Sequence, residues 1–318
     1  MNCKHKLALS GTPIENKLEE LWSIFDFLMP DYLYNYHNIQ THYEKGIVRE
    51  NDAEKSRKLK QLIEPFVLRR TKKEVLTELP DKIEKTLTLD FNEEEKRMYI
   101  ANLSQVNQKL SNLLKMEQVD KIQILAMLTR LRQICAEPRI LYENVTGLSS
   151  KLEGCLELLE TLRDSGKKTL LFSSFTSVLD LIEEECRRRH FSVIKLTGST
   201  SKEDRRAYVQ RFQSGDADVF LISLKAGGTG LNLTAAEAVI HYDPWWNISA
   251  ENQATDRAYR IGQNNNVQVF KLIMKDCVEE RMTELQQKKK ELSDLFVGNN
   301  EGSLSKMTTE DLIRLFEL

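Results

Sequence analysis

The sequence TLLFSSFTSVLDLIEEECRRRHFSVIKL, residues 169–196, carries the pattern that decides the fold. An apolar run at 169–173 is followed by a segment of helical periodicity at 177–189, and a second apolar run follows at 192–196. Strands that are mainly apolar and alternate with helices of about ten or more residues are typical of a parallel sheet covered on both faces. These residues therefore predict one strand–helix–strand unit of such a sheet.

The same alternation continues on both sides of this unit. We expect helices at 151–163, 202–213 and 249–259, and strands at 218–223, 238–242 and 267–273. The result is an α/β domain of about 130 residues with the organisation of a nucleoside-triphosphatase. In an open parallel sheet, functional residues gather at the carboxyl ends of the strands.

Residues before 149 are mainly helical and rich in charge, with long periodic runs at 55–75 and 93–135. An extended piece at 82–91 interrupts them. A short strand is expected at 6–9, and because few strand candidates follow it, its partner strands are expected outside this chain. Beyond the α/β domain we expect a long helix at 278–296, a Gly/Asn/Ser break at 298–303 and a short helix at 309–316.

Composition excludes several classes of protein. The 318 residues include 46 basic and 48 acidic ones, so the net charge of −2 leaves any nucleic-acid binding to a local field. The apolar runs are far shorter than the ~20 residues of a membrane span, and no secretory signal is visible, so an intracellular protein is expected. Five scattered cysteines without a CxxC pair make a zinc site or a disulfide framework improbable.

Two polar turns follow predicted strands. Thr197 to Ser201 is rich in hydroxyls and opens a helix, so it is either a phosphate cradle or a simple helix cap. The segment SLKAGGTGLNL, residues 223–233, holds Gly227, Gly228 and Gly230, which permit positive φ angles and a close approach to a ligand. A tight strand connection would also need one of these glycines.

Adjacent tryptophans, Trp245 and Trp246, lie on the loop 243–247 after the next predicted strand. Such rings either anchor the loop in a core or contact a partner, and core anchoring is expected for at least one of them.

The segment QATDRAYRIGQ, residues 253–263, places Gln253, Arg257 and Arg260 on one face of the expected helix. Two guanidinium groups on one face suit a polyanionic ligand and could neutralise charge on a transferred phosphoryl group. The alternative for such a pair is a solvated helix face, with Asp256 and Arg260 paired.

Six segments in order resemble motifs III to VI of the Swi/Snf-type ATPases in the second helicase superfamily. They are LALSGTPIENKLEELWSIFDFLMP, LRRTKKEV with its following LPDK, FSSFTSVLDLIE, AGGTGLNLT, DPWWN and QATDRAYRIGQ. The resemblance implies a double-stranded DNA translocase in which two RecA-like lobes clamp ATP with Mg²⁺, and the missing first lobe holds most of the nucleotide. It also implies four regions: the end of the first lobe (1–30), a linker with a helical protrusion (31–147), the second RecA-like lobe (148–277) and brace helices (278–318).

The resemblance also implies roles for individual residues. Arg257 and Arg260 would be arginine fingers with Gln253 as their partner, while Thr12 would lie at the lobe interface. The nucleotide cleft would be bordered by Gly228, Thr229 and Gly230. Residues near the tracked DNA strand would be Ser173, Ser174, Phe175, Thr197, Gly198, Lys225 and Trp245.

This sequence departs from the family pattern in two respects. Ile248 stands where members commonly carry proline, and no GxxxxGKS/T or DExH-like acidic pair occurs. Without a phosphate-binding lysine and a magnesium carboxylate, this chain alone is not expected to hydrolyse ATP. Besides the hypothesis that this chain is one lobe of an ATP-driven DNA translocase, two alternatives stay open. One is a non-catalytic DNA-binding or scaffold module with the same fold, and the other is a strand-separating helicase.

Overall fold

The structure of the chain is a computed structural model that describes residues 5–9, 18–33, 35–38, 53–68, 79–115, 121–227, 230–296 and 315–316. It divides into two compact units. The first contains residues 1–77 with two later segments, 246–249 and 285–307. The second contains residues 78–245, 250–284 and 308–318, and it holds the whole sheet.

In the first unit the described elements are α1 (Leu18–Leu28), α2 (Tyr36–Asn38), α3 (Ala53–Ile63) and the 3₁₀ turn η2 (Glu64–Phe66). Its apolar core includes Phe25 and Leu59. The helix expected over 55–75 ends at Ile63, where Pro65 enters the following turn and cannot donate a helical hydrogen bond. Residues 6–9 form no strand here and the side chain of Leu9 is 100% exposed, so the strand expected there, whose partner strands were expected outside this chain, stays a prediction.

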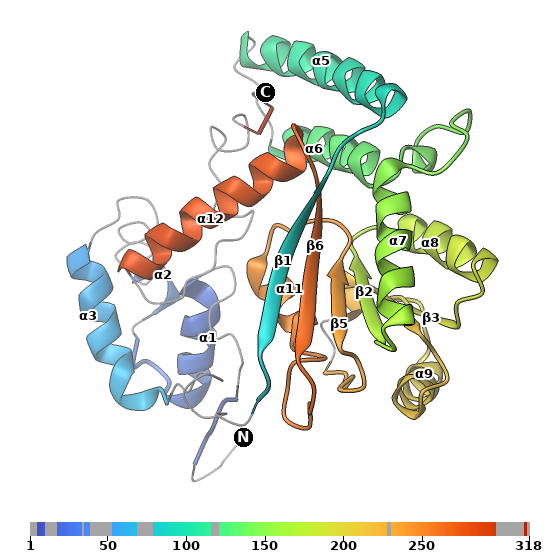
Figure 1. Cartoon of the computed structure of the whole chain (residues 1–318). Coiled ribbons are helices and arrows are strands. Elements are labelled where there is room, and N and C mark those ends of the chain that lie inside the picture. Colours follow the sequence, from blue (N-terminus) through green and yellow to red (C-terminus); the bar gives the residue numbers. More distant parts are fainter. Residues whose placement is uncertain are drawn as a thin grey trace. The chain divides into compact units, whose positions relative to one another are not determined.

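The second unit is built on a parallel sheet with strand order β1-β6-β5-β2-β4-β3 (Figure 1). The strands are β1 (Lys82–Leu89), β2 (Thr169–Ser173), β3 (Val193–Leu196), β4 (Val219–Ser223), β5 (Ala238–His241) and β6 (Val267–Met274). The five strands predicted between 169 and 273 are confirmed to within one residue at each end. The predicted α/β fold with a parallel sheet is therefore confirmed.

Strand β1 comes from the extended piece that interrupts the helical segment 31–147. It pairs with β6 over its whole length, from Lys82 opposite Val267 to Leu89 opposite Met274. Leu87 and Leu89 pack against the core of the sheet, while the first half of the strand is exposed, as suits an edge strand. The sheet therefore takes one strand from residues that precede 148.

Helices cover both faces of the sheet. Alternate side chains point to opposite faces, so Leu171 joins the core under α7 (Ser150–Asp164) and α8 (Thr176–Arg188). Leu170 and Phe172 join the core on the other face, which is covered by α9 (Lys202–Ser214) and α11 (Ile248–Thr255).

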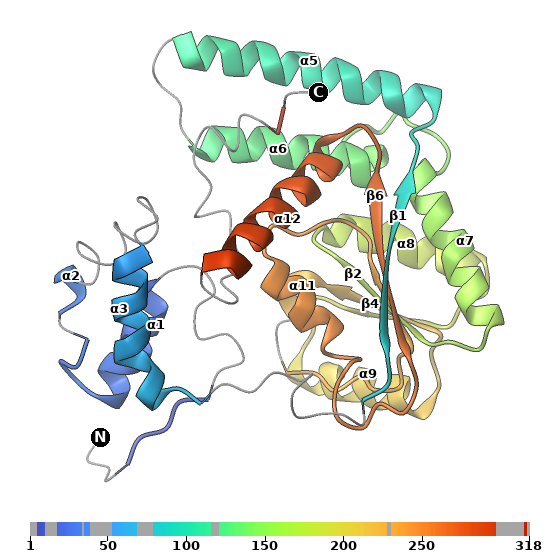
Figure 2. The ribbon, with the colours of Figure 1, turned by 60° about the vertical axis from the view of Figure 1, so that its left-hand side comes forward.

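Two helices of the expected protrusion, α5 (Glu93–Lys115) and α6 (Lys121–Ala136), lie side by side beyond the carboxyl ends of β1 and β6 (Figure 2). The short turn η3 (Pro138–Ile140) leads from α6 toward α7. After β6, α12 (Val278–Phe296) has the predicted bounds. The helix expected at 309–316 lies outside the described residues except for Leu315 and Phe316, which are buried in a turn. Among the helices that the structure describes, none combines the length and the apolar character that crossing a membrane requires.

Candidate functional site

Polar turns follow the carboxyl ends of four neighbouring strands of the sheet. Ser174 and Phe175 follow β2, Thr197 follows β3, and Trp245 lies just beyond β5. Lys225 lies in α10 (Leu224–Gly227), the short helix after β4. Because all these strands are parallel, the turns lie at one edge of the sheet, which we call the carboxyl edge.

The carboxylate of Asp243 lies at the centre of the carboxyl edge and is completely buried. It accepts hydrogen bonds from the Ser173 hydroxyl at 2.6 Å, from the Ser174 backbone N–H at 3.0 Å and from the Ser174 hydroxyl. A buried carboxylate needs such donors and a counter-charge, because its transfer out of water is costly. The predicted DNA-contacting hydroxyls of Ser173 and Ser174 are thus bonded within the protein.

The counter-charge is Arg132, a buried residue of helix α6. Its Nη2 lies 3.1 Å from Asp243 Oδ2 and 2.8 Å from the carbonyl oxygen of Pro244. The guanidinium carbon also lies 5.3 Å from the ring centre of Phe175 and 6.0 Å from that of Trp245. The sequence analysis missed this pair, because a lone arginine in a helical run gives no signal of a partner more than a hundred residues away.

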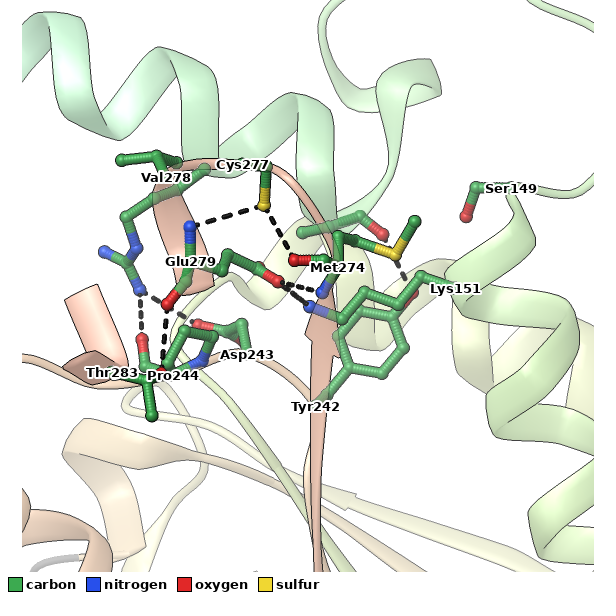
Figure 3. Close-up of polar contacts among 12 residues, drawn as sticks. Ser149, Lys151, Tyr242, Asp243, Pro244, Met274, Cys277, Val278, Glu279 and Thr283 are labelled. Carbon is green, nitrogen blue, oxygen red and sulfur yellow. Dashed lines mark hydrogen bonds and ion pairs between the residues drawn. The ribbon is translucent and has the colours of Figure 1, made fainter. Parts of the chain in front are cut away.

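A second buried ion pair lies beside this one (Figure 3). Lys151 Nζ, from α7, lies 2.7 Å from both carboxylate oxygens of Glu279 in α12. Glu279 also accepts the Met274 backbone N–H at 3.0 Å, and the ammonium group lies 5.3 Å from the ring centre of Tyr242. Burial raises the pKa of Glu279, while the attraction to Lys151 opposes the rise.

The turn after β3 is organised as a helix cap. The Ser201 hydroxyl accepts the Asp204 N–H at 3.1 Å, and the Thr200 hydroxyl accepts the Thr197 N–H at 3.0 Å. Arg205, one turn into α9, donates to the carbonyl oxygens of Thr200 and Thr197 at 3.1 and 3.2 Å. At Gly198 an added Cβ would meet nothing within 4 Å, so this turn is open on its outer side.

The glycine segment after β4 is described only in part. Gly228 and Thr229 lie outside the described residues, as does the side chain of Lys225. Gly230 is exposed, and an added Cβ there would meet nothing within 4 Å. Its φ lies outside the left-handed region, and the open space beside it would let a ligand approach the backbone.

The arginine segment differs from the expected helix 249–259. Helix α11 ends at Thr255, and tighter turns follow, in which the Arg257 N–H bonds to Ala254 O at 3.1 Å and the Gln263 N–H to Arg260 O at 3.0 Å. Gln253 is therefore helical, while Arg257 and Arg260 lie in these turns. The expectation of a single helix face for all three side chains is wrong.

Both arginines are partly buried and their charges interact. Burial lowers the pKa of the Arg257 guanidinium, the neighbouring Arg260 charge lowers it further, and the Asp256 carboxylate opposes the shift. The Arg260 guanidinium donates to the carbonyl oxygen of Leu231 at 3.3 Å, a contact that the alternative of a solvated helix face did not include. Two like charges held close together in a desolvated place favour an anionic ligand.

Gln263 ties the arginine turns to residues 234–236, which directly follow the glycine segment. Its buried amide nitrogen lies 3.1 Å from Thr234 O, 2.8 Å from Ala236 O and 3.2 Å from Ala258 O. A backbone hydrogen bond of 2.9 Å from Leu233 N to Arg257 O joins the same two segments. Gln263, like Arg132, was not singled out by the sequence analysis.

Comparison with known proteins agrees with this arrangement. Residues 1–140 match the family described as SNF2-related domain, and residues 150–262 match the helicase conserved C-terminal domain. Bacillus subtilis YwqA, named as an ATP-dependent helicase/translocase, is 39% identical over 322 residues, which cover 99% of this chain and 35% of that protein. The SWI2/SNF2 ATPase core of Sulfolobus solfataricus, solved in complex with dsDNA, has a TM-score of 0.61 and 33% identity, covering 97% of this chain and 66% of the other. The chain belongs to the Swi/Snf family.

The sheet of this Swi/Snf chain is therefore RecA-like, as the resemblance implied. Another relative, the ISWI chromatin-remodeling complex ATPase ISW1 of Saccharomyces cerevisiae, is 32% identical over 316 residues, which cover 95% of this chain and 28% of that protein. The chain spans about a third of the length of the curated relatives it matches.

Several residues with roles implied by the Swi/Snf resemblance remain predictions. Thr12, Gly228 and Thr229 lie outside the described residues, and the side chain of Lys225 is not described. In the part of the chain that the structure describes, no three His, Cys, Asp or Glu side chains are grouped so as to hold a metal ion.

Proposed function

We propose that this chain is the second lobe of a Swi/Snf-type ATP-dependent translocase on double-stranded DNA. In this proposal Arg257 and Arg260 approach the triphosphate, with Gln253 beside them, and the carboxyl edge contacts the DNA backbone. Gly228, Thr229 and Gly230 border the nucleotide. The observation that carries the proposal is the pair of interacting, partly buried guanidinium groups on backbone that is tied to the glycine segment.

The arginine pair fits the phosphates of ATP for a physical reason. A triphosphate would offset the mutual repulsion of Arg257 and Arg260, and guanidinium groups bind phosphate oxygens in pairs. Both could stabilise the charge that spreads over the transferred phosphoryl group. The sequence lacks the GxxxxGKS/T element and a DExH-like acidic pair, which in motors of this kind hold the phosphates and Mg²⁺. We therefore infer that this chain alone does not turn over ATP.

The arginine assignment is tested by Arg260→Ala in the full-length protein, with ATP turnover measured with and without duplex DNA. We expect kcat to fall by about 100-fold or more, because removing one charge-stabilising donor usually costs at least that much. Arg187→Ala is the matched control, since Arg187 forms a surface ion pair with Glu183 on α8 and turnover should not change.

Two results would contradict the proposal. Undiminished DNA-stimulated turnover in Arg260→Ala would remove the role of Arg260. A wild-type protein that binds duplex DNA yet hydrolyses no ATP, even with the first lobe present, would instead favour a non-catalytic DNA-binding module. Strand separation is distinguished by a displacement assay on the full-length protein, in which we expect no unwinding.

A further inference from the structure

The guanidinium of Arg132 joins two turns that belong to different strands. The turn after β2 contributes Ser174 and Phe175, and the turn after β5 contributes Asp243 and Pro244. Strands β2 and β5 are direct neighbours in the sheet. Arg132 itself comes from α6, in the pair of helices beyond the carboxyl ends, so a third element fixes the geometry of both turns.

We propose that Arg132 is a positioning residue for DNA binding: it holds the turns at 174–175 and 243–245 in one arrangement without contacting DNA itself. This inference rests on the proposed function, in which these turns face the DNA backbone. The side chain of Arg132 is only 5% exposed and that of Asp243 is 0% exposed, so neither is placed to contact a phosphate directly.

The Arg132 side chain combines hydrogen bonds with aromatic contacts. Its Nη2 atom donates to Asp243 Oδ2, to Pro244 O and to Ser174 Oγ. The guanidinium carbon lies 5.3 Å from the ring centre of Phe175 and 6.0 Å from that of Trp245. A lysine ammonium could replace the Nη2 donor, but it lacks the planar group that stacks on aromatic rings, so it could not keep both sets of contacts.

Loss of the guanidinium has a defined consequence. Asp243 would become a buried carboxylate whose donors are Ser173 and Ser174, both from the β2 side. The Pro244 carbonyl oxygen would also lose the Arg132 hydrogen bond, so the β5 turn would no longer be tied to α6. Groups that must meet the phosphates of one DNA strand would then have to be ordered on binding, which weakens affinity.

The test uses Arg132→Lys and Arg132→Met in the full-length protein. Arg130→Gln is the matched control, because Arg130 lies on the same helix and bonds to Asn102 and Tyr142 within the helical region. Binding of a labelled DNA duplex is measured by fluorescence anisotropy, together with the DNA concentration for half-maximal ATPase stimulation. We expect the Kd for the duplex and the DNA concentration for half-maximal stimulation to rise about tenfold in the two Arg132 variants, equivalent to about 1.4 kcal/mol. Both should stay unchanged in Arg130→Gln. The KM for ATP should not follow them.

Hydrogen exchange supplies the readout that a general loss of stability would not give. In the DNA-free Arg132 variants, exchange should rise selectively in peptides covering 174–176 and 243–246, while the amides of β4 and β6 stay protected. Arg132→Lys keeps the positive charge and most of the aliphatic side chain, so it provides the test if Arg132→Met does not fold. Variants that fold and bind DNA within twofold of wild type, about 0.4 kcal/mol, would overturn this inference alone. A wild-type protein that does not bind the duplex would overturn the proposed function, and this inference with it.

Discussion

Replacing Lys151 by Met should destabilise the sheet-bearing unit by about 3–5 kcal/mol, the usual cost of leaving one partner of a buried ion pair uncompensated. The structure supports the upper part of this range, because both side chains are 0% exposed and Nζ lies 2.7 Å from each Glu279 oxygen. After the substitution, the Met274 N–H at 3.0 Å would remain as a donor to that carboxylate. Such a loss is a large part of the ~5–15 kcal/mol that typically stabilises a folded protein.

The double variant Lys151→Met/Glu279→Leu separates the cost of an orphaned charge from the value of the pair. Removing both charges should restore stability to within about 1–2 kcal/mol of wild type, the remaining cost being the unpaired Met274 N–H. The coupling energy of the cycle should therefore exceed about 1 kcal/mol in favour of the pair. Arg187→Met, which breaks a surface ion pair with Glu183 and leaves Glu183 its second partner Lys195, is the control and should change stability by at most about 1 kcal/mol.

The loss of stability in Lys151→Met, called its stability deficit below, should depend on pH in a definite direction. Burial raises the pKa of Glu279, and the variant lacks the ammonium that opposes this rise. An acid whose folded pKa exceeds its unfolded pKa binds more protons when folded, so stability falls as pH rises through that window. The deficit should thus shrink as pH falls from about 7 toward about 5. The stability deficit is measured by urea unfolding and by hydrogen exchange of the β5 and β6 amides. A deficit below about 1 kcal/mol at neutral pH, or one that grows on acidification, would refute the reasoning.

Two further predictions concern buried polar groups. Burial lowers the pKa of His241, whose Nε2 lies 3.0 Å from Thr255 Oγ1. The stability that depends on neutral His241 should therefore be fully present above pH ~6.5 and be lost as the pH falls below it. In urea titrations, His241→Asn should flatten this pH dependence. Gln263→Leu should cost about 2 kcal/mol or more, since the two amide hydrogens that serve the carbonyl oxygens of Thr234, Ala236 and Ala258 are lost. Gln263→Glu should be destabilised at neutral pH and recover on acidification, when its carboxyl group can donate. A Gln263→Leu variant as stable as wild type would contradict this account.

The sequence predicted the central part of the fold because its signal is local. The strand Val219–Ser223 is buried at every position and apolar over its first four residues, which is the signature of burial on both faces. Strand β1 lacks this signature: its first half is exposed, and only its pairing with β6 places it in the sheet. Edge pairing between segments so far apart in the chain leaves no periodic pattern to find.

The local structure of the candidate site was not predicted from the sequence. The spacing of Gln253, Arg257 and Arg260 suits a helix, yet the backbone changes to i→i−3 bonds after Ala254 and Thr255 and reaches a positive φ of 96° at Gly262. Arg132 and Asp243 depend on each other across 111 residues, and neither stands out alone. Long-range polar pairs of this kind become visible only once the elements are packed.

The connection between the arginine turns and the glycine segment bears on how a motor of this kind could work. Leu233 N bonds to Arg257 O, while the side chains of Gln263 and Arg260 donate to carbonyl oxygens of residues 231–236, so one backbone bond and several side-chain bonds make the connection. If phosphate is bound at Arg257, a displacement of the arginine turns must displace residues 231–236 with them. That coupling supports our assignment of nucleotide and DNA contacts to one lobe.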